Sequence, residues 1–170
     1  MTDAPDRRRP RPVVLTLSVL VIVLLAASVA LAFVVKSHVD ARDEVVLSRD
    51  SALQAGRQAI LNLDALSADT IDADLKRVLD GATGQFKTQF SQAQADLKGL
   101  VVSRKTSSRG TILSAGVVRA DSASATVLVA VDRLVKDSTN TTGTTAHDRW
   151  KVSLERRGGR WLVSVLDAVA

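Results

Sequence analysis

A run of 23 uncharged residues, from Val13 to Val35, constrains the architecture of this chain more than any other feature. As a helix rising about 1.5 Å per residue, the run would extend about 34 Å, slightly more than the ~30 Å apolar core of a bilayer. Sixteen of these residues are Leu, Ile, Val or Phe, each of which favours membrane insertion. We therefore expect a single membrane-spanning helix over residues 13–35.

The charges on either side of this run predict its orientation. Four arginines and two aspartates lie within the first twelve residues, whereas two basic residues are offset by three acidic ones between residues 36 and 44. Because basic flanks stay in the cytoplasm, residues 1–12 are expected to be a cytoplasmic tail at the plasma (inner) membrane. The alternative is a cleaved signal peptide, since Ala30, Leu31 and Ala32 form a small-residue cleavage pattern. The run is longer than the usual ~7 to 15 residues of such a peptide, which favours the anchor.

The residues after the span are expected to form one extracytoplasmic domain. Residues 37–170 number 134, which is enough for one hydrophobic core and too few for two. They hold 18 Lys and Arg against 16 Asp and Glu, so the electrostatic footprint of a nucleic-acid-binding protein is absent. The chain has no cysteine, which excludes disulfides and Cys-ligated metals.

Three helices are predicted before the strands. A stalk helix over residues 36–66 continues from the span, with Ala52, Gly56, Ala59 and Leu63 on one face. This face packs either on the domain's own sheet or on a partner helix. The remainder of the domain, residues 67–170, begins with a short helix that ends at Gly81.

The start of that short helix and the third helix are read from side-chain type and spacing. Side-chain oxygens between Ser67 and Asp72 can cap the start of the short helix. A third helix opens at Gly84 and places Phe86, Phe90 and Leu97 on one face.

Beyond Gly99 the pattern changes to alternation, which predicts about four antiparallel strands. One strand contains Val117 and Val118, and the next runs from Ala125 to Leu134. A third alternates around Trp150, and a reversal at residues 157–160 leads into a fourth that begins at Trp161. Both tryptophans are expected beside this reversal, pointing toward the helices. The fold class is therefore α+β, with helices on one face of a curved antiparallel sheet.

The sequence contains no convincing catalytic or metal-binding set. His38 lies next to the span, and His147 and Asp148 are neighbours in a strand, so their side chains point to opposite faces. Two distant histidines do not supply a zinc site. The acidic residues Asp69, Asp72, Asp74 and Asp80 lack the spacing of a calcium loop, and helix capping explains them better. We expect no catalytic residues, no cofactor and no metal.

Five segments together resemble the actinobacterial Mce-associated membrane proteins. They are residues 74–86 (DLKRVLDGATGQF), 116–118 (GVV), 127–131 (VLVAV), 149–152 (RWKV) and 159–163 (GRWLV). The resemblance covers nearly the whole exported domain, and it includes the order of basic tail, single span and helical stalk.

This resemblance implies a cystatin-like cone domain and an accessory role in Mce systems, which transport lipids or sterols across the cell envelope. It makes Mce transporter subunits or other envelope proteins the expected partners, with lipid as a further one. The alternatives are a lipid-binding or enzymatic cone anchored at the membrane, or an assembly subunit similar to those of secretion systems. The lack of a catalytic set favours a non-enzymatic subunit.

Overall fold

The computed structural model describes residues 47–169, so the expected tail, the span and the first part of the stalk lie outside the described residues. Within these bounds no helix is both long and apolar enough to cross a bilayer. The expected order of three helices followed by four antiparallel strands is confirmed. The elements are a helix at residues 47–64, α2 (Ile71–Asp80), α3 (Gly84–Arg104), β1 (Ser107–Ala120), β2 (Ser124–Lys136), β3 (Thr144–Arg157) and β4 (Arg160–Ala168).

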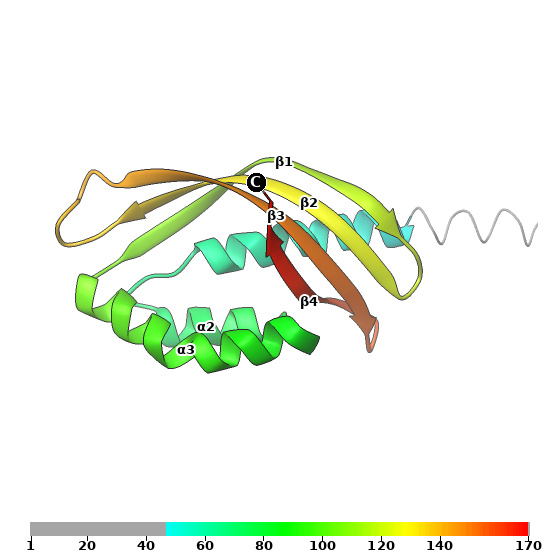
Figure 1. Ribbon diagram of the computed structural model, residues 1–170, viewed down its shortest axis with the longest axis horizontal. Helices are drawn as coiled ribbons and strands as arrows, with labels where there is room; N and C mark the ends of the chain where they lie inside the picture. The colour runs from blue at the N-terminus through cyan, green and yellow to red at the C-terminus, as the bar shows by residue number, and fades with distance from the viewer. Residues whose placement is uncertain (1–46, 170) are drawn as a thin grey trace, which may run out of the picture. The chain divides into compact units, whose positions relative to one another are not determined.

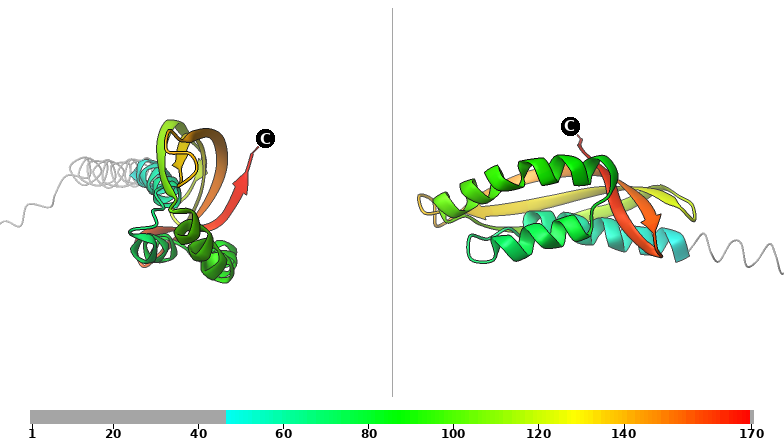
Figure 2. Two further views of the ribbon diagram at one scale, coloured as in Figure 1. Left: turned by 90° about the vertical axis from the view of Figure 1, so that its left-hand side faces the viewer. Right: turned by 90° about the horizontal axis from the view of Figure 1, so that it is seen from below.

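The four strands form one antiparallel meander in the order β1-β2-β3-β4. The expected reversal between β3 and β4 is a two-residue turn at Gly158 and Gly159, whose φ angles of 56° and 81° favour glycine. The sheet curves over the 47–64 helix, and α2 and α3 lie on the same side of the sheet as that helix (Figure 1). The start of α3 also contacts β4. Two further views show the same arrangement (Figure 2).

The 47–64 helix packs its small-residue face on the sheet of the same chain. Ala52 and Ile60 are buried in a cluster with Val127 and other inward residues of β2 and β3. Gly56 allows this close approach, because a Cβ there would lie 3.2 Å from the side chain of Val127. Of the two expected uses of this face, the domain's own sheet is therefore the one observed.

A second apolar cluster joins α2 to α3 and corrects the predicted end of α3. Leu75 and Val78 of α2 pack with Phe90 and Val101 of α3. The change of pattern after Gly99 predicted strand there, but the helix continues to Arg104 and ends at Lys105 in the left-handed conformation. The Val-rich segment is helical because its buried side chain, Val101, packs on α2.

Both tryptophans point toward the core, as expected, but only one lies beside the β3–β4 turn. Trp161 pairs with Arg156 near the turn, and its indole Nε1 donates a 2.9 Å hydrogen bond to Ser51 Oγ. Trp150 pairs instead with Ala168 at the opposite end of β4. Each side chain is half-buried against the sheet cluster. The expectation that Trp150 lies beside the turn is wrong, since β3 runs seven residues further.

Candidate functional site

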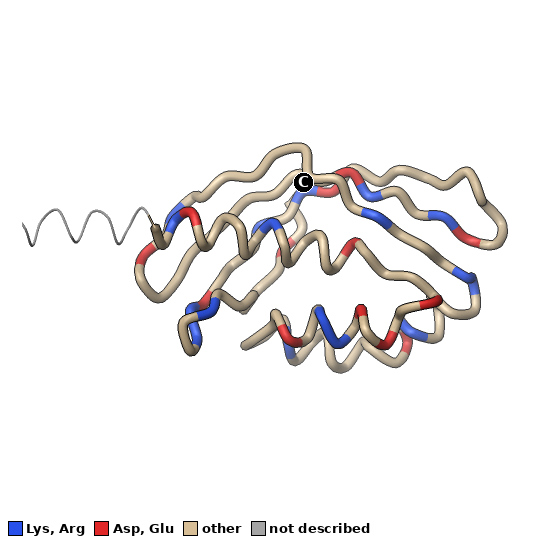
Figure 3. Tube along the Cα trace, turned by 180° about the vertical axis from the view of Figure 1, so that it is seen from behind, with Lys and Arg blue, Asp and Glu red and all other residues tan. Residues whose placement is uncertain are grey.

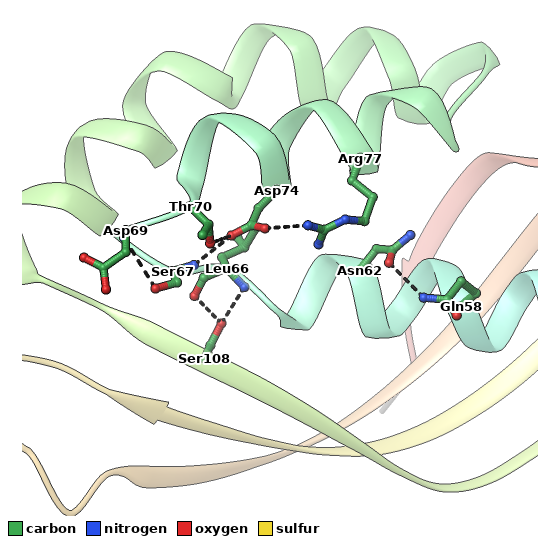
Figure 4. A network of polar contacts seen from close by, with 9 residues as sticks. All are labelled: Gln58, Asn62, Leu66, Ser67, Asp69, Thr70, Asp74, Arg77 and Ser108. Carbon is green, nitrogen blue, oxygen red and sulfur yellow. Dashed lines mark hydrogen bonds and ion pairs between the residues drawn. The ribbon is translucent and has the colours of Figure 1, made fainter.

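Three of the acidic residues near α2 each pair with a different basic side chain. Asp74 is buried and accepts hydrogen bonds from the Ser67 amide (3.1 Å), the Thr70 hydroxyl (2.7 Å) and the Arg77 guanidinium (3.0 Å), as Figure 4 shows. Asp74, a residue of the helix itself, thus stabilises the start of α2 by accepting hydrogen bonds from the residues that precede the helix. The residue at the N-cap, Thr70, makes no side-chain capping bond of its own.

Asp72 and Asp80 have basic partners on different helices. Asp72 pairs with Lys98 at 2.5 Å, and Asp80 pairs with Lys76 at 2.6 Å. Among residues 47–169 there is no group of three or more His, Cys, Asp or Glu side chains arranged to hold a metal ion. The acidic residues therefore stabilise the helices through ion pairs and local hydrogen bonds.

His147 and Asp148 lie on opposite faces of the sheet, as expected, and each has a charged partner on β2. His147 Nδ1 lies 2.6 Å from Asp132 Oδ1 on the outer face, where the imidazole is largely exposed. Thr111 on β1 pairs with Asp132 and carries a hydroxyl group, so the three residues could be compared with a catalytic triad. In a nucleophilic triad the imidazole lies between the hydroxyl and the carboxylate, whereas here the Asp132 carboxylate lies between Thr111 and His147. This order does not suit acyl transfer. His38 lies outside the described residues.

An ion network around one buried carboxylate occupies the inner face. Arg133 Nε lies 2.9 Å from Asp148 Oδ2 and 3.5 Å from Asp64 Oδ1. Asp64 comes from the end of the first helix, and its side chain is 2% exposed. Gly110 of β1 makes room for it, because a Cβ there would lie 2.8 Å from Asp64 Oδ2. The network thus joins the helix to β2 and β3, and Asp64 packs against β1 at Gly110.

One oxygen of this network has no partner. Asp64 Oδ2 is buried and accepts no hydrogen bond from any described residue. Burial raises the pKa of Asp64 to about 6; Arg133 opposes this rise and Asp148 adds to it. An acid of this pKa can exchange a proton near neutral pH. Asp64 lines neither the groove beside α2 nor the hollow on the sheet, so we assign the network to folding and pH response.

The outer edge of β1 is largely unpaired. At its start, the Ser108 amide donates to the Leu66 carbonyl, and Ser67 forms an isolated bridge with Ser107. Beyond Ser108 no backbone hydrogen bond reaches this edge from any described residue. A strand edge without a partner is a natural place for another chain to bind.

Apolar side chains project from this edge strand. Register shifts in β1 leave Leu113 and Val118 outside the regular pairing with β2, and their exposed fractions are 63% and 59%. Leu128 and Val169 add exposed apolar atoms around a hollow of about 270 Å³ on the sheet. Apolar groups gathered in this way mark interaction surfaces. Alternation did not identify them, because a bulge changes which residues face outward.

The sequence of this chain is similar to that of a mycobacterial protein. A family model described as "Uncharacterized protein Rv1363c/MT1408-like" matches residues 12–170. Rv1363c of Mycobacterium tuberculosis is 28% identical over 163 residues, which is 95% of this chain and 62% of that protein. The chain thus spans less than two thirds of the length of this relative.

Comparison of structures identifies the fold. The periplasmic domain of DotI superposes with a TM-score of 0.57 and 12% identity, over 69% of this chain and 91% of that chain. An IcmL-like type IV secretion system protein from Legionella pneumophila also gives a TM-score of 0.57, with 10% identity over 69% and 88% of the two chains. At such low identity the likeness establishes a shared fold alone.

Proposed function

The chain belongs to the Rv1363c/MT1408-like family, and from this premise we propose that it is a non-catalytic, membrane-anchored subunit that supports assembly of a multiprotein complex in the cell envelope. The observation that carries the proposal is the open edge of β1, where Leu113 and Val118 project from two bulges. Exposed apolar residues on an unpaired edge suit a protein partner better than a small substrate.

The location follows from the N-terminal sequence and from the fold. The uncharged run at residues 13–35, preceded by arginines, supports an anchor with its N-terminus in the cytoplasm and the domain outside. The similarly folded DotI domain is periplasmic, which fits the same side of the membrane.

We further propose that the complex is a Mce-type lipid or sterol transporter. The support is the resemblance carried by residues 74–86 and by the hairpin of β3 and β4 (RWKV and GRWLV). In this role the domain binds a transporter subunit through the β1 edge, and lipid reaches the transporter without chemical change. Bulges interrupt the regular edge, so the contact relies on side chains more than on strand addition.

The test compares two surfaces in the native cell. Deleting residues 47–170 should lower both the abundance of transporter subunits and lipid uptake. The double variant Leu113→Glu/Val118→Glu should do the same while its own membrane level stays normal. Leu100→Glu/Val102→Glu is the matched control, since these α3 residues are also exposed apolar side chains. Normal complex levels and uptake in the deletion strain, with no paralogue present, would refute the proposal.

An enzymatic role predicts different effects of substitutions at His147 and Asp132. If the domain were an enzyme, His147→Ala or Asp132→Asn should abolish function while protein and partner levels remain unchanged. The subunit role predicts mild effects from both substitutions, because the two side chains form an exposed pair on the outer face.

A further inference from the structure

The 47–64 helix and α2 run side by side (Figures 1 and 4). A groove lies between them. It has a volume of about 390 Å³, within the ~300 to 1,000 Å³ range of small-molecule sites. It lies on the helical side of the domain, away from the outer edge of β1. Its lining comes from three elements: Ala55, Gln58, Ala59 and Asn62 of the first helix, Ala73, Lys76, Arg77, Asp80 and Gly81 at α2, and Arg160, Trp161 and Val163 of β4.

The groove is open because the facing helix surfaces carry small residues. Ala55 and Ala59 on one helix face Ala73 on the other, where larger apolar side chains would fill an ordinary helix contact. The large apolar side chains of α2 are turned toward α3 instead. The sequence thus leaves a cavity between the two helices.

The groove also contains more positive than negative charge. Arg77 is neutralised by the buried Asp74 at 3.0 Å. Lys76 and Arg160 share one lining carboxylate, Asp80, which leaves one positive charge of the lining unneutralised. Lys76 binds the Asp80 carboxylate at 2.6 Å, whereas Arg160 donates a hydrogen bond to the Asp80 backbone carbonyl at 3.4 Å.

The surroundings of Asp80 are also positively charged. Its pKa lies below the ordinary value because Lys76 donates a hydrogen bond to it, and because Lys76, Arg160 and Lys87 surround it with positive charge. Three cations therefore act on one carboxylate. In the domain as a whole, acidic and basic residues are interspersed along the chain (Figure 3), so this surplus is local.

We propose that this groove binds a small phosphate-bearing ligand, with Arg160 and Lys76 holding the phosphate. A guanidinium and an ammonium at the edge of a partly enclosed groove suit the anionic oxygens of a phosphate group. The Gln58 and Asn62 amides, 2.9 Å apart on the helix wall, supply further hydrogen bonds. The Trp161 indole and Val163 provide an apolar surface for the rest of the ligand. The phosphate belongs either to a soluble metabolite or to a lipid headgroup.

The proposal is tested by calorimetric titration of the full chain in phosphatidylcholine nanodiscs with glycerol 3-phosphate, and separately with inorganic phosphate. We expect saturable binding that Arg160→Gln weakens about tenfold or more. Arg157→Gln is the matched control: it lies in the same hairpin, pairs with Glu155 at 2.6 Å and does not line the groove. It should leave the affinity unchanged.

A second pair of variants separates the groove from surface charge. Ala73→Phe fills the groove from an exposed position without changing charge, and it should abolish binding. Ala95→Phe, an exposed position on α3, should have no effect. Absence of saturable binding, or equal losses from Arg157→Gln and Arg160→Gln, would overturn the proposal.

The source of the phosphate is distinguished by repeating the titration in nanodiscs that contain phosphatidylglycerol. If a lipid headgroup fills the groove, these discs should suppress binding of added glycerol 3-phosphate. If the ligand is soluble, the two kinds of disc should give the same affinity. Either result supports the groove as a phosphate site.

Discussion

Replacing Asp64 by Asn should stabilise the domain near neutral pH and remove a pH dependence. The pKa of Asp64 is about 6 in the folded protein and its ordinary value is 3.8. The folded state therefore binds more protons than the unfolded state between these values, so stability falls as pH rises through this range. A difference of about 2 units corresponds to about 3 kcal/mol. Asp64 alone should therefore make the free energy of unfolding of the wild type lower at pH 7 than at pH 4 by about this amount.

Asn keeps the shape of the side chain without its charge, and Arg133 keeps its 2.9 Å contact with Asp148. We therefore expect Asp64→Asn to gain about 1 to 3 kcal/mol at pH 7.5 and little at pH 4.5. The assay is urea unfolding of residues 44–170, which form one compact unit, at pH 4.5, 5.5, 6.5 and 7.5. Asp96→Asn on α3 removes an exposed carboxylate and serves as control.

The informative quantity is the difference between wild type and variant at each pH, because other titrating groups cancel in it. If the stability gained by the variant grows with pH, desolvation of the Asp64 carboxylate outweighs its attraction to Arg133. A variant that is less stable than the wild type at every pH would refute this reasoning, since it would mean that attraction to Arg133 exceeds the cost of burial.

Three further predictions concern stability, each measured by urea unfolding of the same fragment. Trp161→Ala should lower the free energy of unfolding by about 2 to 4 kcal/mol, because it removes packing on the sheet cluster and the hydrogen bond to Ser51. An unchanged urea unfolding curve would instead indicate an exposed binding residue. Gly110→Ala should cost about 1 to 3 kcal/mol, since the new Cβ would lie 2.8 Å from both the Cβ and the Oδ2 of Asp64, and the cost should shrink when Asp64 is also changed to Gly, which removes both atoms. The pKa of Asp121 is lowered by amides of the β1–β2 turn, so it contributes stability above about pH 4 that is lost on acidification; Asp121→Asn should flatten the curve between pH 5 and pH 3.

Much of the fold could be predicted from the sequence because its periodicities are clear. Alternating valines identified β2, and the glycine pair identified the turn before β4. The end of α3 was missed because valine near Gly99 resembles strand, and only its packing on α2 shows that the segment is helical. The bulges in β1 also escaped prediction, since they depend on pairing with β2.

The ion network was not predicted, although a signal for it was present. Asp64 continues the four-residue spacing of Ala52, Gly56 and Ile60, which places a carboxylate on the buried face of the helix. Alternation from the inward Val131 likewise places Arg133 inward. Two residues of opposite charge at positions that the pattern assigns to the core indicate a buried ion pair. The groove beside α2 had no comparable signal, because it depends on how two helices meet.

The most direct test of the proposed function places a photo-crosslinking amino acid at position 113 of the full chain in native membranes. Position 100 on α3 is the matched control, since Leu100 is also exposed and apolar. The account predicts a crosslink from position 113 to a subunit of a Mce-type transporter and none from position 100. No transporter crosslink at position 113, or equal crosslinks from both positions, would contradict it.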